Sequence, residues 1–327
     1  MSKNMIVEAK NIKKYFPVEG KIKAYPKMVK AVDDVSLTLY ENETYGLVGE
    51  SGCGKSTFGR TLLRLLDPTE GSIVVNGKDI THMKEQELRK YRENMQMIFQ
   101  DPYTSLNPRK RIGDILNEVL VIHGVKDRQE RMSATLEIMA KVGLRPEHYY
   151  RYPHEFSGGQ RQRVGLARAL ILNPGFIVCD EPVSALDVSI QSQIVNLLLD
   201  LQQERGITYL FIAHDLSVVK YISDRIGVMY LGNLVEEAPA EELFQNPLHP
   251  YTQALLSAVP STKIEENNTK ERVILTGDLP SPIDPPSGCP FHTRCPYAKA
   301  YCGDYVPKMK EHAPGHRLKC FRYNGIK

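Results

Sequence analysis

The sequence predicts an α/β fold for this chain of 327 residues, and three observations carry that prediction. A glycine-rich motif lies between a short apolar run and a helical stretch, which is the setting of a phosphate-binding loop. Short apolar runs alternate with helices in the second half of the chain, the rhythm of a parallel sheet. The composition, 42% hydrophobic and 25% charged, is close to the average of globular domains. The chain is long enough for one large domain or two smaller ones.

The composition also argues against several classes of protein. A formal net charge of +3 is too small to indicate a nucleic-acid partner. No run of about 18 apolar residues could span a bilayer, and the N-terminus lacks the apolar core of a secretion signal. Six cysteines in a chain of this length do not indicate a disulfide scaffold. We therefore expect a protein of the cytoplasm.

The N-terminal part has the pattern of an antiparallel sheet. Apolar and polar positions alternate along residues 5–48, and a charged loop interrupts them at 17–30. Phe16, or failing it Tyr15, lies upstream of the glycine-rich motif, where an aromatic ring could stack on an adenine. The alternative for this aromatic residue is a core position at the end of the first strand.

The glycine-rich motif fits G-x-x-x-x-G-K-[ST] and consists of Gly49, Glu50, Ser51, Gly52, Cys53, Gly54, Lys55, Ser56 and Thr57. A short buried strand is expected before it at 45–48, and a helix after it at 58–66. The glycines let backbone N–H groups approach phosphate oxygens, and a helix N-terminus favours an anion. We expect Lys55 to reach the β- and γ-phosphates and the Ser56 hydroxyl to ligate Mg²⁺. The alternative is a glycine-rich turn before an ordinary helix.

The chain then changes character twice. Two further strands are expected at 71–77 and 95–99, the first closed by an Asn-Gly turn. A helical insertion follows at about 101–172, with helical spacing at 112–123, 128–142 and 158–172. Strands return at 176–179, 208–212 and 226–230, separated by helices at 190–204 and 216–222. The second half therefore predicts βαβ units.

Two carboxylates end the buried strand at 176–179. Asp180 is expected to hold Mg²⁺, directly or through water, where this strand emerges beside the phosphate loop. Glu181 points differently and can polarise the water that attacks the γ-phosphate, a role that contributes about 10²–10⁴-fold. A strand followed by Asp-Glu is a weak signal alone and becomes a strong one together with the loop at Gly49.

A second anion-receptive helix start lies after Phe156. Ser157 is a candidate N-cap, and Gly158 and Gly159 leave the N–H groups of the first turn uncovered. One chain needs one phosphate loop per nucleotide, so this helix indicates a nucleotide held by a partner chain. The alternative is an ordinary capped helix after a turn.

Residues 5 to about 258 resemble an ATP-binding-cassette (ABC) ATPase. The motifs occur in the order and spacing of that family: the loop at Gly49, Gln100 at a strand end, Ser157-Gly158-Gly159-Gln160, Asp180-Glu181, Ser184-Ala185-Leu186-Asp187 and His214. The resemblance implies a nucleotide-binding domain with a mixed sheet core, an antiparallel β subdomain and a helical insertion. Such cassettes dimerise head to tail and hold two ATP molecules, each between one protomer's phosphate loop and the other's signature helix.

The same resemblance implies roles for the matching residues. Gln100 would touch Mg²⁺ and sense transmembrane partners. Ser157 and Gly159 would contact the γ-phosphate across the interface, with Gly158 and Gln160 in the same nucleotide-binding signature. Asp187 would line the dimer seam, His214 would contact the γ-phosphate from its own side, and Phe16 would stack on the adenine. Phe156 stands where the general pattern has Leu, and both are apolar.

From about residue 260 the composition shifts to polar and proline-rich. The motifs His249-Pro250-Tyr251-Thr252, Leu279-Pro280-Ser281-Pro282 and Gly288 to Pro296 resemble the C-terminal extension of dipeptide/oligopeptide-importer ATPases. Its cysteines Cys289, Cys295, Cys302 and Cys320 are spaced C-x5-C-x6-C-x17-C, which matches neither common zinc spacings nor ferredoxin runs. Four thiolates could still hold a [4Fe–4S] cluster or structural zinc. The resemblance favours the iron–sulfur cluster, then zinc, then disulfides, while Cys53 and Cys179 are expected to be packing residues.

The resemblance implies an ABC ATPase domain at 1–259 and a C-terminal extension with a four-cysteine site at 260–327. It implies an ATP-hydrolysing subunit that powers a membrane importer of di- and oligopeptides, with Glu181 and His214 as catalytic residues. The partners would be a second, similar ATPase chain, two transmembrane permease subunits and an extracytoplasmic peptide-binding protein, with no nucleic acid. The chain would be a peripheral protein on the cytoplasmic face of the membrane.

Three alternatives come from related or different classes of protein. Importer ATPases for nickel chelates or glycosides share the same motifs. A soluble ABC ATPase that acts on DNA or ribosomes usually carries two cassettes or a long coiled-coil insertion, and neither occurs in this sequence. A regulatory or metal-sensing protein would not require the complete set of Asp180, Glu181 and His214.

Overall fold

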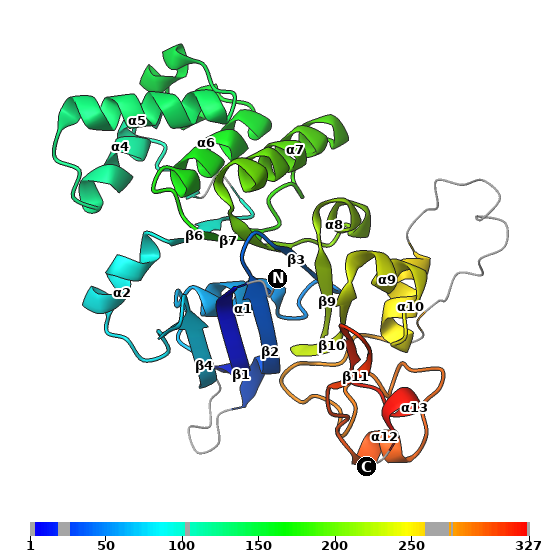
Figure 1. The fold of residues 1–327 in the computed structure, drawn as a ribbon. Helices are drawn as coiled ribbons and strands as arrows, with labels where there is room; N and C mark the ends of the chain where they lie inside the picture. Colours follow the sequence, from blue (N-terminus) through cyan, green and yellow to red (C-terminus); the bar gives the residue numbers. More distant parts are fainter. Residues whose placement is uncertain (1–3, 19–26, 102–104, 259–274, 276, 326–327) are drawn as a thin grey trace. The chain divides into compact units, whose positions relative to one another are not determined.

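The computed structural model describes residues 4–18, 27–101, 105–258, 275 and 277–325. The chain forms two compact units, and each is described by itself (Figure 1). The helical unit comprises residues 1–6, 39–43 and 82–212. The phosphate-loop unit comprises residues 7–38, 44–81 and 213–327. The predicted domain boundary at 259/260 lies outside the described residues.

An antiparallel sheet occupies the N-terminal part of the phosphate-loop unit, as the alternating pattern predicted. Its strands lie in the order β2-β1-β4-β5, with β1 at Met5–Pro17, β2 at Met28–Tyr40, β4 at Glu70–Val75 and β5 at Lys78–Asp79. β1 pairs antiparallel with β4, with Val7 opposite Val75 and Ala9 opposite Ile73. Asn76 and Gly77 both have positive φ angles, of 49° and 74°, which suits the tight turn between β4 and β5.

A second sheet of the same unit carries the phosphate loop. Its strands lie in the order β11-β12-β10-β9-β3, with β3 at Thr44–Val48, β9 at Arg225–Tyr230, β10 at Asn233–Pro239, β11 at Lys310–Ala313 and β12 at His316–Leu318. β3 is buried along its whole length and pairs parallel with β9, whereas β9, β10, β12 and β11 pair antiparallel. The strands at 45–48 and 226–230 were predicted, but β10 was not.

Helices cover the phosphate-loop unit: α1 at Lys55–Leu62, α8 at Leu216–Ile222, α9 at Ala240–Gln245, α10 at Pro250–Ser257, α12 at Tyr301–Asp304 and α13 at Phe321–Asn324. The prediction that the first helix runs from 58 to 66 was wrong at both ends. It starts at Lys55, directly after the glycine loop, and ends at Leu62, because Arg64 has a left-handed φ of 53°. Leu65 is 44% exposed and is no part of an apolar helix face.

The helical unit contains a parallel sheet of strands that the sequence predicted. The order is β8-β7-β6, with β6 at Met95–Ile98, β7 at Phe176–Asp180 and β8 at Thr208–Ile212. Both pairings are parallel, with Cys179 opposite Phe211 and Ile98 opposite Cys179. All residues of β7 and β8 are buried, as expected for parallel strands covered on both faces.

The fully described helices of this unit are α2 at Glu85–Arg92, α4 at Ile112–Ile122, α5 at Arg128–Lys141, α6 at Gly158–Leu170 and α7 at Val188–Arg205, with short 3₁₀ turns η1 at Pro146–Tyr150 and η2 at Pro153–Glu155. α4, α5 and α6 pack on one another, and α6 contacts β6. In the described parts of the chain no helix is both long and apolar enough to cross a bilayer.

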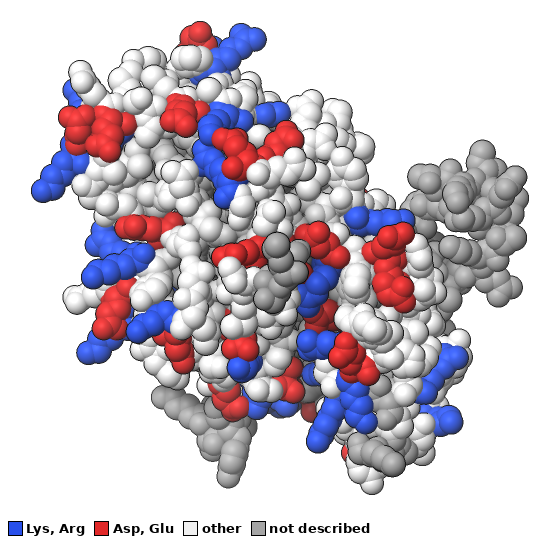
Figure 2. All heavy atoms as spheres, viewed as in Figure 1, with Lys and Arg blue, Asp and Glu red and all other residues white. Residues whose placement is uncertain are grey.

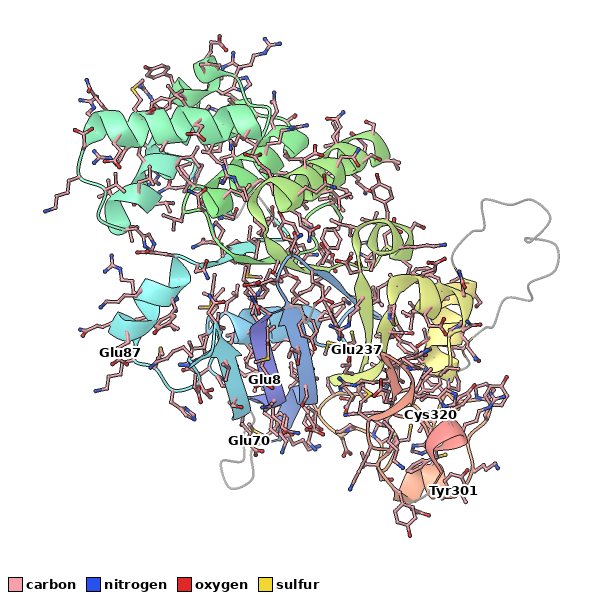
Figure 3. All side chains as sticks on the ribbon, in the orientation of Figure 1. Glu8, Glu70, Glu87, Glu237, Tyr301 and Cys320 are labelled. Carbon is pink, nitrogen blue, oxygen red and sulfur yellow. The ribbon has the colours of Figure 1, made fainter. Side chains whose placement is uncertain are left out.

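The charged side chains on the face shown in Figure 2 are of both signs and are interspersed. Glu8 and Glu70, which Figure 3 labels on β1 and β4, belong to this pattern: Glu8 pairs with Lys10 at 2.8 Å and Glu70 with Lys13 at 2.6 Å. This face therefore carries no extended patch of one sign, in agreement with the small net charge.

Candidate nucleotide site

The phosphate loop requires glycine at two positions because other backbone passes too close. A Cβ atom on Gly54, whose φ is 103°, would lie 2.0 Å from the carbonyl oxygen of Ala31. A Cβ atom on Gly49, whose φ is 150°, would lie 2.2 Å from the carbonyl oxygen of Met229. The loop is thus fixed between β2 and β9 by contacts that only a residue without a side chain allows.

Lys55 lies at the start of α1 and is held by the loop itself. Its ammonium group donates hydrogen bonds to the carbonyl oxygens of Gly49, at 2.8 Å, and Glu50, at 3.0 Å. Gly54 is the N-cap of α1 and supplies no side-chain acceptor for the first turn. A buried cation thus lies beside helix N–H groups that no cap covers, an arrangement suited to an anion with several oxygens.

Cys53 is also buried in this loop. Burial raises the pKa of its thiol, although the neighbouring Lys55 acts in the opposite direction. Cys179, in β7, is fully buried, and burial raises the pKa of its thiol as well. Both cysteines pack as neutral side chains in their described surroundings.

The two aromatic candidates upstream of the loop have different surroundings. Phe16 is half-buried in β1, and the ammonium group of Lys14 lies 4.9 Å from the centre of its ring. The hydroxyl of Tyr15 donates a hydrogen bond to Asp33, and Lys30 lies 5.8 Å from its ring. Because Tyr15 is tied to Asp33, Phe16 remains the better candidate for stacking on a base.

In the helical unit, Asp180, Glu181 and Gln100 lie at the carboxyl ends of β7 and β6. Asp180 is completely buried. Glu181 has a left-handed φ of 48°, and its N–H donates to the carbonyl oxygen of Ile212 at 2.9 Å. The amide Nε2 of Gln100 donates to the Glu181 carboxylate at 2.8 Å, so the fold brings these two predicted residues together. The left-handed backbone of Glu181 turns the chain directly after the buried Asp180.

The helix start after Phe156 is self-capped. Ser157 is the N-cap of α6 and accepts a hydrogen bond from the N–H of Gln160 at 3.4 Å, while Gln160 Oε1 accepts from the N–H of Ser157 at 3.1 Å. A Cβ atom on Gly159 would lie 2.7 Å from Cγ2 of Ile190 in the first turn of α7. Gly159 thus allows α6 and α7 to approach closely at their starts.

Asp187 and His214 lie at the starts of two further helices. Asp187 is the N-cap of α7, accepting from the N–H of Ile190 at 3.0 Å and the hydroxyl of Ser189 at 2.9 Å. The bond from Ile190, with that from Ser189, lowers the pKa of the Asp187 carboxyl. His214 is exposed and precedes Asp215, the N-cap of α8.

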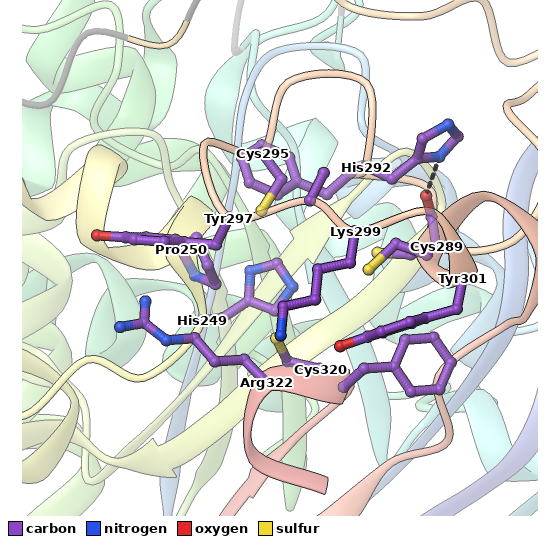
Figure 4. A pocket seen from close by; sticks show the side chains of 14 residues that line it. His249, Pro250, Cys289, His292, Cys295, Tyr297, Lys299, Tyr301, Cys320 and Arg322 are labelled. Atoms are coloured by element: carbon purple, nitrogen blue, oxygen red, sulfur yellow. Dashed lines mark hydrogen bonds between the residues drawn. The ribbon is translucent and has the colours of Figure 1, made fainter. Parts of the chain in front are cut away.

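The four C-terminal cysteines converge on one cavity of about 440 Å³ (Figure 4). Its lining includes Cys289, Cys295, Cys302, Cys320 and His249. The four cysteines are free thiols, so the described residues do not support the third alternative, disulfides. Burial raises the pKa of Cys289 to about 12 and raises those of Cys295 and Cys320. Among the described residues, no three His, Cys, Asp or Glu side chains are arranged as ligands of a single metal ion.

Two residues that the sequence did not predict contact the phosphate loop. The N–H of Glu50 donates to the hydroxyl of Tyr251 at 2.9 Å, and Arg294 donates to the Glu50 carboxylate at 3.0 and 3.2 Å. Both belong to motifs that had indicated only the C-terminal extension. Tyr251 and Arg294 lie 201 and 244 residues from Glu50 in the sequence, so no local pattern indicates these contacts.

Comparison with known proteins gives a consistent result. The sequence profile described as "ABC transporter" matches residues 32–184, and that described as "Oligopeptide/dipeptide transporter, C-terminal region" matches residues 235–302. The oligopeptide transport ATP-binding protein AppF of Bacillus subtilis (strain 168) is 56% identical over 321 residues, covering 98% of both chains. The dipeptide transport ATP-binding protein DppF of Haemophilus influenzae is 49% identical over 316 residues, covering 97% of this chain and 96% of the relative.

A solved structure shares the cassette fold. The dimeric, post-hydrolysis state of the ATP-binding cassette MJ0796 bound to ADP and phosphate superposes with a TM-score of 0.65 at 29% identity. The superposition covers 72% of this chain and 99% of that one.

Proposed function

Since the chain belongs to the ABC transporter ATPases, in the family of oligopeptide and dipeptide transport ATP-binding proteins, we propose that it powers a membrane importer of di- and oligopeptides. One observation carries the cargo class: the match to both the cassette and the C-terminal region of peptide transporters, with 56% identity to AppF along 98% of the chain. ATP hydrolysis is the activity of this family, and the phosphate loop has the geometry for it.

The proposed roles follow from the surroundings of each side chain. Lys55 exchanges its hydrogen bonds to Gly49 and Glu50 for the β- and γ-phosphate oxygens of ATP, a gain because the new acceptors are charged. Backbone N–H groups at the start of α1 bind the same phosphates, and Phe16 stacks on the adenine. Ser56, Gln100 and Asp180 would be the residues that hold Mg²⁺, which when bound would supply positive charge to the phosphates.

Glu181 is the proposed base for the attacking water, and Gln100 holds its carboxylate at 2.8 Å. His214 contacts the γ-phosphate from the same chain. Ser157 and Gly159 contact the γ-phosphate of a partner's ATP, with Gly158 and Gln160 beside them and Asp187 at the seam. The closed dimer is then stabilised by contacts to a γ-phosphate that hydrolysis removes.

The proposed partners follow from this cycle. A second, similar ATPase chain completes each nucleotide site, and two transmembrane permease subunits receive the motion through Gln100 and the helices at 101–172. An extracytoplasmic binding protein delivers the peptide. The chain itself is proposed to be peripheral, on the cytoplasmic face of the membrane. The ABC ATPase domain is proposed at 1–259 and the four-cysteine extension at 260–327.

The cysteine cavity is proposed to hold a [4Fe–4S] cluster. Four thiols facing one cavity are the ligand set of such a cluster, and a space of about 440 Å³ has room for one. Cys289, Cys295, Cys302 and Cys320 would be its ligands, and the cluster would hold the extension in shape.

The cluster proposal can be tested independently of the transport proposal. Protein purified without oxygen should contain about four irons and four sulfides per chain if the cluster is present. Replacement of Cys302 by Ser should lower the iron content. Zinc in place of iron, or neither, would reject the cluster without affecting the ATPase assignment.

The transport proposal is tested in the complete assembly. The chain should co-purify with two membrane subunits, and its ATP hydrolysis in lipid vesicles should rise when binding protein and a peptide are added together. Stimulation by a nickel chelate or a glycoside, but not by peptides, would overturn the cargo class and leave the importer function intact.

A further inference from the structure

The phosphate loop is held from outside by the last part of the chain. Glu50 is the residue through which this contact runs. Its N–H donates to the Tyr251 hydroxyl at 2.9 Å, and its carboxylate accepts two hydrogen bonds from Nη1 of Arg294, at 3.0 and 3.2 Å. Its carbonyl oxygen accepts from the Lys55 ammonium at 3.0 Å. One residue therefore connects the C-terminal extension to the lysine that is expected to meet phosphate.

The surroundings of this ion pair limit its screening by solvent. The side chain of Arg294 is 9% exposed and that of Glu50 30%. The Arg294 guanidinium lies 5.9 Å from the centre of the Tyr230 ring. Tyr230, Tyr251 and Phe291 are buried and pack together, with ring centres 4.8 to 5.5 Å apart. An ion pair against this apolar cluster is stronger than one on an open surface.

The backbone that carries Arg294 is ordered by its own hydrogen bonds. The N–H of Arg294 donates to the carbonyl oxygen of Phe291 at 3.0 Å, and the N–H of His292 donates to that of Cys289 at 3.0 Å. The N–H of Cys289 donates to the carbonyl oxygen of Cys302 at 2.7 Å. Cys289 and Cys295, at the two ends of this segment, line the cysteine cavity. The wall of the cavity and the contact to the phosphate loop are thus parts of one structured segment.

We propose that Arg294 is a positioning residue of the nucleotide site: it fixes Glu50, and through Glu50 the conformation of the phosphate loop, before ATP binds. A loop that is already in its binding conformation loses less conformational entropy when the nucleotide arrives. The proposed effect of Arg294 on the site runs through its two hydrogen bonds to the Glu50 carboxylate. Its contribution should therefore appear in ATP affinity and not in the rate of the chemical step.

The test uses the full-length chain and Arg294→Gln, which removes the charge and leaves a shorter, neutral polar side chain. Titration with a fluorescent ATP analogue should give a dissociation constant about tenfold higher, the order expected for a partly buried charge-assisted contact. The KM for ATP should rise by a similar factor, while kcat stays within about twofold. Arg294→Lys should recover part of the affinity, because it keeps the charge but not the forked geometry.

Arg317→Gln is the matched control. Arg317 also pairs with a glutamate in the same unit, with Nη1 3.5 Å from Glu237 Oε2, and that pair does not contact the phosphate loop. This variant should bind the analogue as the unchanged protein does. A comparable loss of affinity in Arg317→Gln would attribute the Arg294 effect to general weakening of the extension and overturn the proposal.

A double-mutant cycle identifies the partner. Glu50→Gln should weaken binding by itself, and adding Arg294→Gln should then cost little more, because the contact is already lost. The proposal is overturned if the two effects simply multiply, or if Arg294→Gln binds ATP with unchanged affinity. Should Arg294→Gln unfold, Arg294→Lys and Glu50→Gln give the same comparison with smaller changes.

Discussion

The two helix starts that the sequence singled out for anions differ in how they satisfy their own backbone. At α1 the N-cap is Gly54, and its first turn has no side-chain acceptor. At α6 the N-cap is Ser157, which forms a reciprocal capping box with Gln160. The first N–H groups of α1 therefore need an acceptor from another molecule, whereas those of α6 already have the Ser157 side chain as an acceptor.

This difference suits a site that is open in one chain and completed by another. The α1 start, with Lys55 beside it, can bind a triphosphate without help. In the proposed dimer, the α6 start would exchange a cap that is 3.4 Å long, and therefore weak, for a phosphate oxygen. Such an exchange is favourable only when another molecule presents the phosphate. Four predictions test this distinction, from the largest expected effect to the smallest.

Glu181→Gln should stop the proposed cycle in the closed dimer, in which α1 of one chain and α6 of its partner bind the same triphosphate. Hydrolysis should fall about 10²–10⁴-fold because the proposed base is lost, while ATP binding persists. Size-exclusion chromatography in ATP should show a long-lived dimer. Glu204→Gln, which removes an exposed carboxylate paired with Lys141 at 2.5 Å, is the control and should hydrolyse normally. Normal hydrolysis by Glu181→Gln would refute the assignment of the base.

Lys55→Ala should disable the α1 start directly. We expect ATP hydrolysis to fall about 10²–10³-fold, the usual effect of losing one fixed donor to the reacting group. Phosphate release and nucleotide titration measure it, and both should be affected. Lys10→Ala removes an exposed lysine paired with Glu8 at 2.8 Å and should change neither. Normal ATP binding by the monomeric Lys55→Ala variant would show that the N-terminus of α1 does not bind ATP by itself.

Ser157→Ala should weaken the α6 start only. ATP-dependent dimerisation should become about tenfold weaker for one lost hydrogen bond, with ATP affinity of the single chain unchanged. Removal of the N-cap should also lower the free energy of unfolding by about 1 kcal/mol.

Asp127→Ala separates these two effects. Asp127 caps α5 by accepting from the N–H of Glu130 at 2.7 Å, and it belongs to no predicted site. It should show the loss of stability without the loss of dimerisation. Equal dimerisation by Ser157→Ala and Asp127→Ala would mean that the α6 cap is only structural.

A third helix start, at α10, should affect stability and its pH dependence without affecting nucleotide binding. His249 is the N-cap, and its Nδ1 accepts from the N–H of Tyr251 at 3.1 Å. Burial lowers the pKa of His249 to about 4, although the nearby Glu236 opposes that shift. Because the unfolded chain binds a proton more readily, stability from this residue is complete above pH of about 6.5 and is lost as the pH falls toward 4.

His249→Asn keeps a capping acceptor and removes the titration. Chemical unfolding between pH 6.5 and 4 should therefore show a shallower loss of stability, by up to about 3 kcal/mol over the interval. ATP titration at pH 7 serves as the control and should be unchanged. An identical pH profile for the variant would show that His249 does not titrate in this interval.

The sequence predicted most of the elements whose signals are local. α8 has the predicted bounds of 216–222, and the strands of the helical unit begin and end within a residue or so of the expected positions. The motifs predicted which residues form the phosphate loop, and the fold places Gln100 against Glu181. These features depend on neighbouring residues or on motifs with a fixed local geometry.

The elements that were missed depend on distant partners. β10 contains Glu236 and Glu237, which are completely buried, so its pattern did not resemble a buried strand. Their burial is possible because His316 Nε2 lies 2.7 Å from Glu236, and Arg225 pairs with Glu237. The contact of Arg294 with Glu50 is of the same kind, since no local pattern links two charged residues so far apart in the chain.

The pairing of β12 with β10 has a consequence for shortened forms of this chain. Glu236 lies opposite Leu318 and Glu237 opposite Arg317, and the N–H of Lys319 donates to the carbonyl oxygen of Val235 at 2.8 Å. A protein truncated before the extension would leave β10 as an uncovered edge strand, and the buried carboxylates of Glu236 and Glu237 would lose His316 and Arg317 as partners. Unpaired edge strands recruit other chains, so such a truncation should aggregate during expression, and the extension would then also keep the protein in solution.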